Sequence, residues 1–309
     1  MRTVALTATP EAMLRLACYA SDPRPEIQRE LAKAWQYFDP ERYAHDVLAD
    51  APLVNGSIWV DSRRFLAHLP ALRSVTCADV WLPNHEPLDT LEVFAGIKNI
   101  ELIRAVLRGD IDVTPLLEHR GLRSVLLFFA DSYANLAELG QLPRLIDLNL
   151  RLSREHSDLG FLANLPELVQ LSLGELSPTV DFSPFGRLRS LGYLNTEGWP
   201  RGVPWSALPE LPNLRRLRLG SRTVPDALVG ISAHLPGLAE LILVGPVVAN
   251  LAPVSGMTSL ERLMLLDAGR QTVDLRPLAG TSLEVWLTRR GRYAGLDELG
   301  DGVRVRWAK

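Results

Sequence analysis

The sequence predicts an α/β fold: a single curved solenoid of about ten to eleven short coils, with a parallel sheet on its concave side and a helical cap at its N-terminal end. Three observations carry this prediction. Leucine is the commonest residue, an apolar pattern recurs every 22 to 25 residues, and proline recurs in step with it. A fixed period of this kind indicates stacked coils, each of which packs only on its neighbours.

The recurring pattern is L-x-x-L-x-L, with other apolar or small residues in place of leucine at some positions. Its first residues stand at positions 72, 97, 122, 145, 168, 191, 214, 238, 260 and 283. Side chains alternate across a strand. Each copy therefore predicts one strand with buried leucines, and the residues between them are expected to face outward.

Prolines mark the segments between these strands. Pro115, Pro184, Pro253 and Pro277 form one such set. Proline lacks a backbone donor and disfavours helix at the residue before it. The return part of each coil is therefore expected to be a short 3₁₀-like or extended segment and not a long α-helix.

The strands, together with returns such as residues 181–185 and 274–278, resemble the short leucine-rich repeats of internalin-like proteins over roughly residues 55–309. The resemblance implies a leucine-rich repeat solenoid. One departure concerns the asparagine that the family usually places three residues after the last strand leucine. Here such positions hold Ala130, Leu176 and Arg222, so the turn that leaves each strand must satisfy its backbone groups in another way.

Residues 1–54 are predicted to form a helical N-terminal cap, ahead of a repeat domain at residues 55–309. Thr9, Asp22 and Asp39 each precede a proline, and each is expected to cap a short helix. The open end of a solenoid exposes apolar surface. These helices would cover it.

Residues 35–49 also resemble the HEAT-like helices that precede the repeats in bacterial NACHT-type signalling ATPases. The nucleotide module of that family carries a Walker A loop, and this chain contains no G-x-x-x-x-G-K-[ST] motif. The resemblance therefore implies a ligand-sensing arm without its own nucleotide site, which would act with an ATPase chain.

No catalytic, cofactor-binding or metal-binding residue is predicted. Cys18 and Cys77 form neither a disulfide framework nor a zinc pattern, and Cys77 is expected in an inward strand position. Residues 155–158 bring glutamate, histidine, serine and aspartate together. An enzyme whose site is built from loops near His156 or Trp199 is the weakest of the functional alternatives.

The net charge of −3 gives no basic field that would attract nucleic acid or an anionic membrane. Residues 241–260 contain no charge, but they include glycines and prolines and keep the register of the repeats, so no membrane span is predicted. The N-terminus lacks the pattern of a signal peptide. A cytoplasmic location is expected, with no small-molecule substrate.

Two groups on the concave face are candidate contact residues. The first combines side chains that dominate interface hot spots, with two tryptophans as possible loop contacts: Tyr193, Asn195, Arg216, Arg218, Trp199 and Trp205. The signs of Arg216, Glu240 and Arg262 alternate, however, and a solvated ladder of mutually neutralised charges is the other interpretation.

The second group is an apolar patch in the last three coils: Ile242, Val244, Met264, Leu266, Val285 and Leu287. Exposed apolar patches commonly mark contact sites. Self-association or a folded-back C-terminal cap would also cover such a patch. The sequence thus predicts a non-enzymatic module that presents a rigid concave surface to a protein partner of unknown identity.

Overall fold

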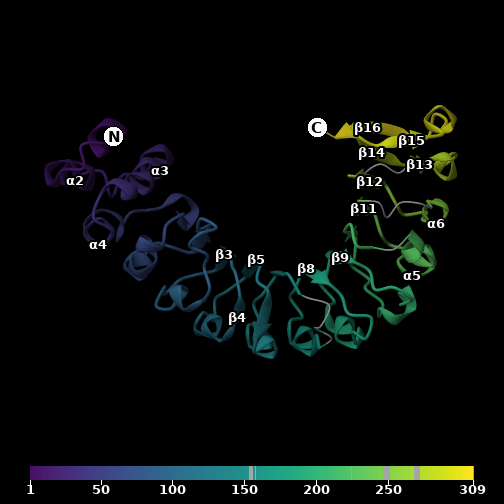
Figure 1. The fold of residues 1–309 in the computed structure, drawn as a ribbon, viewed down its shortest axis with the longest axis horizontal. Helices are drawn as coiled ribbons and strands as arrows, with labels where there is room; N and C mark the ends of the chain where they lie inside the picture. Colours follow the sequence, from purple (N-terminus) through teal and green to yellow (C-terminus); the bar gives the residue numbers. More distant parts are fainter. Residues whose placement is uncertain (153–155, 157, 224, 246–250, 268–271, 309) are drawn as a thin grey trace. The chain divides into compact units, whose positions relative to one another are not determined.

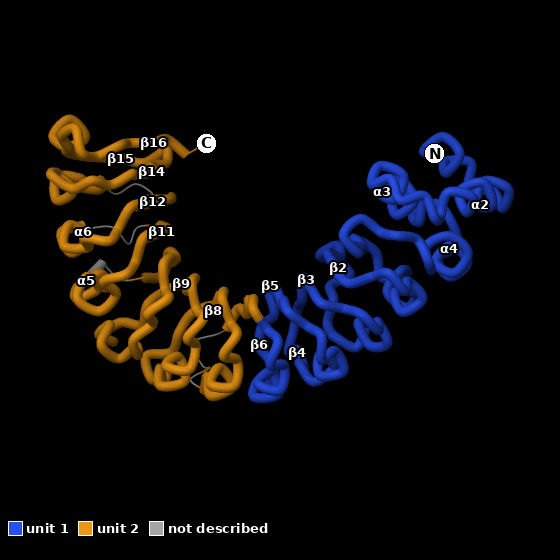
Figure 2. Tube along the Cα trace, turned by 180° about the vertical axis from the view of Figure 1, so that it is seen from behind, with its two compact units in different colours: residues 1–145 blue, residues 146–309 orange. Residues whose placement is uncertain are grey.

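The structure is a computed structural model that describes every residue except 153–155, 157, 224, 246–250, 268–271 and 309. The chain divides into two compact units, residues 1–145 and residues 146–309 (Figure 2). Each unit contains its own run of parallel strands, connected by short helical turns.

Unit 1 begins with short helical segments: α1 (Arg2–Ala5), α2 (Pro10–Ala17), α3 (Pro25–Ala34), η1 (Trp35–Tyr37), α4 (Pro40–Tyr43), η2 (Ala44–Leu48) and η3 (Val54–Gly56). Two predicted caps are confirmed. Thr9 Oγ1 accepts a hydrogen bond from Ala12 N at 3.2 Å, and Asp39 Oδ1 accepts one from Arg42 N at 2.9 Å. Each of these helices begins at the proline that follows its cap, where the missing N–H costs nothing.

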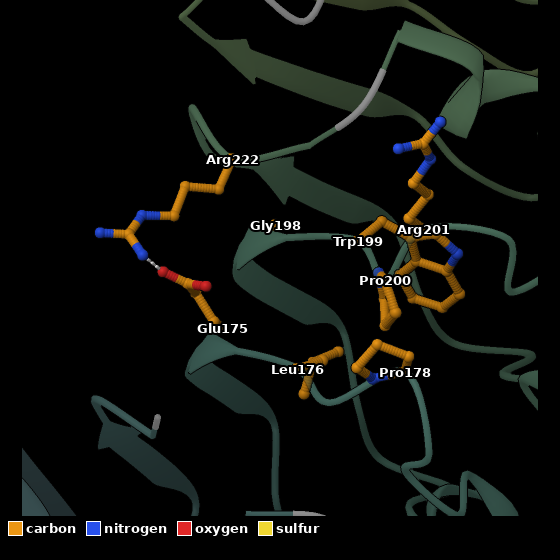
Figure 3. A pocket seen from close by; sticks show the side chains of 8 residues that line it. All are labelled: Glu175, Leu176, Pro178, Gly198, Trp199, Pro200, Arg201 and Arg222. Carbon is orange, nitrogen blue, oxygen red and sulfur yellow. Dashed lines mark ion pairs between the residues drawn. The ribbon is translucent and has the colours of Figure 1, made fainter. Parts of the chain in front are cut away.

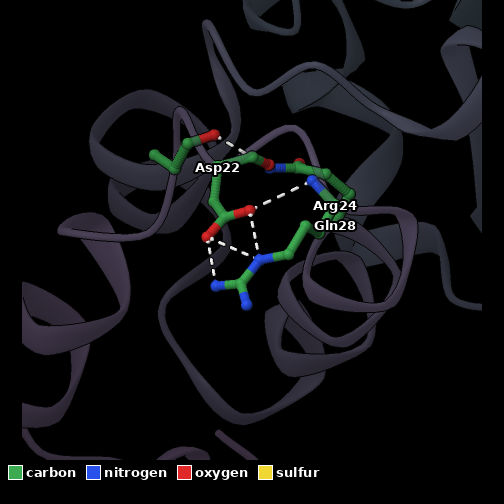
Figure 4. A network of polar contacts seen from close by, with 4 residues as sticks. Asp22, Arg24 and Gln28 are labelled. Carbon is green, nitrogen blue, oxygen red and sulfur yellow. Dashed lines mark hydrogen bonds and ion pairs between the residues drawn. The ribbon is translucent and has the colours of Figure 1, made fainter.

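The predicted cap at Asp22 is wrong, because α3 begins at Pro25 and not at Pro23. Asp22 instead closes a local turn: its carboxylate accepts from Arg24 N at 3.0 Å and pairs with the Arg24 guanidinium at 2.6 Å (Figure 4). Hydrogen bonds from Arg24 lower the pKa of Asp22 to about 2. Gln28 Nε2 in α3 donates to the Asp22 carbonyl at 2.6 Å, so this turn is tied to the helix that follows it.

The main strands of unit 1 pair in parallel in the order β1 (Ser57–Val60), β2 (Cys77–Val80), β3 (Leu102–Val106) and β5 (Ser124–Phe128). The other elements of this part are η4 (Arg63–Ala71), η5 (Glu92–Phe94), β4 (Asp110–Asp112), η6 (Thr114–Glu118), β6 (Ser132–Ala134) and η7 (Leu136–Gln141). β4 and β6 form a second, two-stranded parallel pair.

The register of the first two coils differs from the prediction. Ala78 pairs with Ile103, and Ile103 pairs with Val125, and all three side chains are fully buried. Cys77 therefore lies half-buried on the outward face, and its predicted inward position is wrong. The prediction took Val75 as the first buried residue of the strand and so placed Cys77 inward. Val75 is buried, but it precedes β2, and the first inward residue of the strand itself is Ala78.

The main strands of unit 2 also pair in parallel, in the order β7 (Asp147–Leu150), β8 (Gln170–Glu175), β9 (Tyr193–Gly198), β10 (Arg216–Leu219), β11 (Glu240–Val244), β12 (Arg262–Leu266), β14 (Glu284–Thr288) and β16 (Arg304–Ala308). Leu148, Leu171, Leu217 and Leu263 are fully buried at equivalent positions of these strands. They belong to the leucine core that the sequence predicts for this α/β leucine-rich repeat solenoid.

The return segments of unit 2 are η8 (Gly160–Asn164), η9 (Ser183–Arg187), η10 (Trp205–Ala207), η11 (Pro225–Leu228), α5 (Ile231–His234), α6 (Ala252–Ser255), β13 (Thr272–Asp274), η12 (Arg276–Leu278), β15 (Arg292–Ala294) and η13 (Leu296–Glu298). Pro184 and Pro277 lie in short 3₁₀ helices, and Pro253 lies in a four-residue α-helix. The predicted short returns are confirmed. They lie on one side of the sheet of unit 2, and no described helix or strand covers its other side, here called the open face (Figure 1).

Candidate binding surface

Strand register places outward side chains of unit 2 in rows across the open face. The first row is Tyr193, Arg216, Glu240, Arg262, Glu284 and Arg304. The second row is Asn195, Arg218, Ile242, Met264, Trp286 and Arg306. Val244 and Leu266 pair next to the second row. The predicted candidates Tyr193, Asn195, Arg216, Arg218, Ile242, Met264, Val244 and Leu266 therefore lie on one face.

The first row forms a ladder of alternating charges. Glu240 contacts Arg216 at 3.4 Å and Arg262 at 2.7 Å. Glu284 contacts Arg262 of the same row and Arg306 of the second row, each at 3.3 Å. Hydrogen bonds with Glu284 and Glu240 raise the pKa of Arg262, which stays charged. The ladder considered from the sequence is thus present, and Arg216 is one of its members.

Tyr193 stands at the end of this ladder. The Arg216 guanidinium carbon lies 4.8 Å from the centre of the Tyr193 ring, within the range of a cation–π contact. Burial raises the pKa of the Tyr193 hydroxyl, although the positive charges of Arg218 and Arg216 act in the opposite direction. The side chain therefore remains a neutral phenol at neutral pH.

Arg218 is an available cation in the middle of this face, and Arg304 at the edge strand β16 is another. The Arg218 side chain is half-buried and makes no hydrogen bond or ion pair within the part of the chain that the structure describes. Its neighbour Asn195 donates from Nδ2 to Ser172 Oγ at 3.3 Å. On the other side its register partner is Ile242, so Arg218 lies between a polar and an apolar part of the second row.

The apolar patch is smaller than predicted and differs in composition. Ile242 is buried, while Val244, Met264 and Leu266 are half-buried on the open face. Val285 and Leu287 are fully buried, and their predicted exposure is wrong. Leu263 pairs with Val285 and Leu265 pairs with Leu287, because the last step of the repeat is one residue shorter than the pattern suggested.

Trp286 takes the outward position in that coil, between Met264 and Arg306. Trp286 was not predicted to face outward because an L-x-x-L-x-L copy that starts at Leu283 puts position 286 inward and Val285 and Leu287 outward. The sign of Glu284 was the available signal: it continues the alternation of Arg216, Glu240 and Arg262 along the first row.

The predicted loop contacts Trp199 and Trp205 are 3 % and 2 % exposed, and their interpretation as surface contacts is corrected. Their rings stack with centroids 3.9 Å apart. Trp199 Nε1 donates to the Val203 carbonyl at 2.8 Å, and Trp205 Nε1 donates to the Ala227 carbonyl. Both indoles are internal, because each finds its polar partner within the protein.

Unit 1 carries an aromatic group that was not predicted from the sequence. The ring of Trp59, which is 58 % exposed, stacks on Trp81 with a centroid distance of 5.7 Å, and Trp81 lies 5.8 Å from Phe128. Nearby, Asp79 of β2 and Arg104 of β3 form an ion pair at 2.9 Å. The group was missed because the first two coils were placed in the wrong register.

The weakest alternative, a loop-built enzyme site, rests on residues 155–158, of which Glu155 and Ser157 lie outside the described residues. Among the residues that the structure does describe, no three His, Cys, Asp or Glu side chains are grouped so as to hold a metal ion. Within the same described part, no helix has the length and apolar character needed to cross a bilayer.

Solved leucine-rich repeat structures match the chain. Internalin InlF of Listeria monocytogenes is 16% identical with a TM-score of 0.49, over 82% of this chain and 78% of that chain. Internalin C2 of the same organism is 10% identical with a TM-score of 0.36, over 87% and 84%. A Leptospira interrogans leucine-rich repeat protein is 12% identical with a TM-score of 0.32, over 81% and 88%.

At such identities the likeness concerns the repeat architecture, and no residue or partner of those proteins is transferred to this chain. No model of a protein family matches the sequence. A comparison with curated proteins also gives no match. The resemblance of residues 35–49 to the helices of NACHT-type ATPases finds no support in the structures named above and stays a prediction.

Proposed function

We propose that the chain is a non-enzymatic protein-binding module whose contact surface is the open face of unit 2. The observation that carries this proposal is the position of Arg218. It is a cation without an ion pair among the described residues, and it lies beside the phenol of Tyr193 and the apolar residues Ile242 and Met264.

This arrangement suits a protein partner that offers a carboxylate next to an apolar side chain. A guanidinium without a carboxylate partner gains a charge-assisted hydrogen bond on binding. The surrounding side chains sit on paired strands, so little ordering entropy is lost when the partner docks. Arg216 is expected to contribute less to partner binding, because it already forms an ion pair with Glu240 and a cation–π contact with Tyr193.

The test is capture of partners from the source cell by the immobilised full chain, followed by a measured dissociation constant for the identified partner. Arg218→Glu is expected to weaken the binding free energy of that partner by roughly 2 kcal/mol or more, the range of an interface hot spot. Arg187→Glu is the matched control, since Arg187 is an exposed arginine of η9 in the same unit.

Thermal unfolding of both variants shows whether they are folded. If Arg218→Glu captures the partner as well as the native chain does, the open face is not the contact surface and the proposal is wrong. Sedimentation of the native chain alone tests self-association through Met264 and Leu266. A concentration-dependent dimer that Met264→Glu abolishes would show that a second copy of the chain binds these apolar residues.

A further inference from the structure

A cavity of about 280 Å³ lies in unit 2, beyond the ends of β8 and β9 (Figure 3). Loop residues that follow β8, loop residues that follow β9, and Arg222 after β10 line it. This volume is close to the lower end of the range of known small-molecule pockets, roughly 300 Å³. The volume therefore suits a group the size of one or two amino-acid side chains.

One part of the wall is apolar and is held rigidly. Leu176, Pro178, Trp199 and Pro200 contribute to it (Figure 3). Trp205 stacks on Trp199 at 3.9 Å, and Phe182 stacks on it at 5.1 Å. Because Trp199 Nε1 already donates to Val203 O, this indole brings no free donor to the wall, and with 3 % of its surface exposed it contributes a small apolar area.

Gly198 allows the two strand exits to approach each other at this site. A Cβ atom on Gly198 would come within 2.9 Å of the carbonyl carbon of Arg222, closer than side-chain carbons are found. The wall between β9 and the residues after β10 is thus built on a glycine, and the cavity is shaped by backbone as well as by side chains.

The charged groups of the wall are unequal in number. Glu175 and Arg222 form an ion pair on one side, and Arg201 lies on the other side (Figure 3). Arg201 is exposed and makes no hydrogen bond or ion pair with any residue that the structure describes. Two guanidinium groups and one carboxylate leave one positive charge unmatched, and Arg201 carries it.

A guanidinium binds a carboxylate through two parallel hydrogen bonds. A dianion such as phosphate suits this wall less well, because Arg222 is already paired with Glu175 and the second negative charge would find no unpaired cation in the wall. We propose that the cavity binds a monocarboxylate attached to a compact apolar group, with that group against Trp199 and the two prolines and the carboxylate paired with Arg201.

An apolar C-terminal residue of a peptide and a free small acid share this chemistry. Neither Tyr193 nor Arg218 lines the cavity. The ligand site and the proposed partner surface can therefore fail independently of each other.

The experiment titrates the full chain with N-acetyl-leucine, followed by calorimetry and by saturation-transfer NMR on the ligand. Saturable binding is expected. Arg201→Gln should weaken it roughly tenfold, the effect of losing a hydrogen bond to a charged group. Because Arg201 is exposed and unpaired among the described residues, this variant should fold normally. Arg187→Gln makes the same charge change away from the cavity and should bind as the native chain does.

N-acetyl-leucinamide, which lacks the charge, should bind more weakly than N-acetyl-leucine, and inorganic phosphate should compete poorly. The proposal is overturned if N-acetyl-leucine shows no saturable binding, if the amide binds equally well, if phosphate competes more strongly, or if Arg201→Gln has no effect. Within the proposed chemistry, tighter binding of the tripeptide Ala-Ala-Leu than of 4-methylpentanoate identifies a peptide C-terminus, and the reverse order identifies a free acid.

Discussion

His119 is a polar residue at a position that the next coil fills with leucine. It follows η6, it is 6 % exposed, and its Nε2 has no hydrogen-bond partner among the described residues. Leu142 takes the equivalent place after η7, where it makes the same backbone hydrogen bond to the residue three positions earlier. Burial lowers the pKa of His119 below its ordinary value of 6.5, although Glu118 and the Phe94 carbonyl act to raise it.

The depressed pKa makes stability depend on pH. At pH 8 the imidazole is neutral in both states, whereas below pH 6.5 the unfolded chain takes up a proton that the folded chain resists. The free energy of unfolding should therefore fall as pH drops from 6.5 towards the folded pKa. His119→Leu should remove this part of the decline and add about 1–3 kcal/mol at pH 8 by removing the unsatisfied nitrogen.

Urea unfolding of the native chain and of His119→Leu at pH 8 and pH 5 measures both effects. His85→Leu is the control, since His85 is exposed in a loop of the same unit. If the unfolding free energy of His119→Leu falls as much between pH 8 and pH 5 as that of the native chain, other titratable groups cause the pH dependence.

At the scale of the strand, β14 decides which side chains of the last coils face inward. Leu287 is fully buried in β14, whereas Leu266 is half-buried on the open face of β12. Leu287→Ala should cost about 2–5 kcal/mol of unfolding free energy, the range for a buried leucine. Leu266→Ala makes the same chemical change and should cost clearly less.

Chemical unfolding of the two variants compares the registers directly. The register first inferred from the L-x-x-L-x-L pattern places both leucines outward and predicts two small, similar costs. Such a result would contradict the pairing of Leu265 with Leu287.

At the scale of the whole molecule, the repeat makes one coil exchangeable for the next. Leu191 and Leu214 occupy equivalent positions, since Leu194 pairs with Leu217. Deletion of residues 191–213 joins Ser190 to Leu214 and removes one complete coil. Because each coil packs on its neighbours alone, this variant should fold cooperatively with reduced stability.

Deletion of residues 191–202 is the control, because it removes about half a coil, so that the leucines after the deletion no longer align with the buried positions of the preceding coil. Circular dichroism and thermal unfolding distinguish the two. A cooperative transition in the half-coil deletion, or none in the full-coil deletion, would contradict a fold built from exchangeable coils.

The architecture was predictable because the period depends on many leucines, and a single misplaced residue does not alter it. The register of one coil depends on two or three residues. Around Val75 and Ile100 every third residue is apolar, so the pattern alone could not separate the inward Ala78 and Ile103 from the outward Cys77 and Leu102. The aromatic group of Trp59, Trp81 and Phe128 was missed for that reason.

The burial of Trp199 and Trp205 was not predictable from composition either. A tryptophan in a loop has the same sequence appearance whether it faces solvent or stacks on another ring, and the backbone carbonyls that accept its N–H lie on other segments, as Ala227 does for Trp205. The row positions of Arg216 and Arg218, in contrast, followed directly from strand alternation in coils whose period was regular.

Glu240 is the carboxylate on which the electrical balance of the first row depends, because two guanidinium groups share it. A neutral residue at this one position would leave Arg216 with only the Tyr193 ring and Arg262 with only Glu284. Arg216 and Arg218 would then be two neighbouring cations without a carboxylate partner among the described residues. Glu240 thus sets whether one or two unneutralised arginines lie beside Tyr193, and with that how strongly this face would attract polyanions.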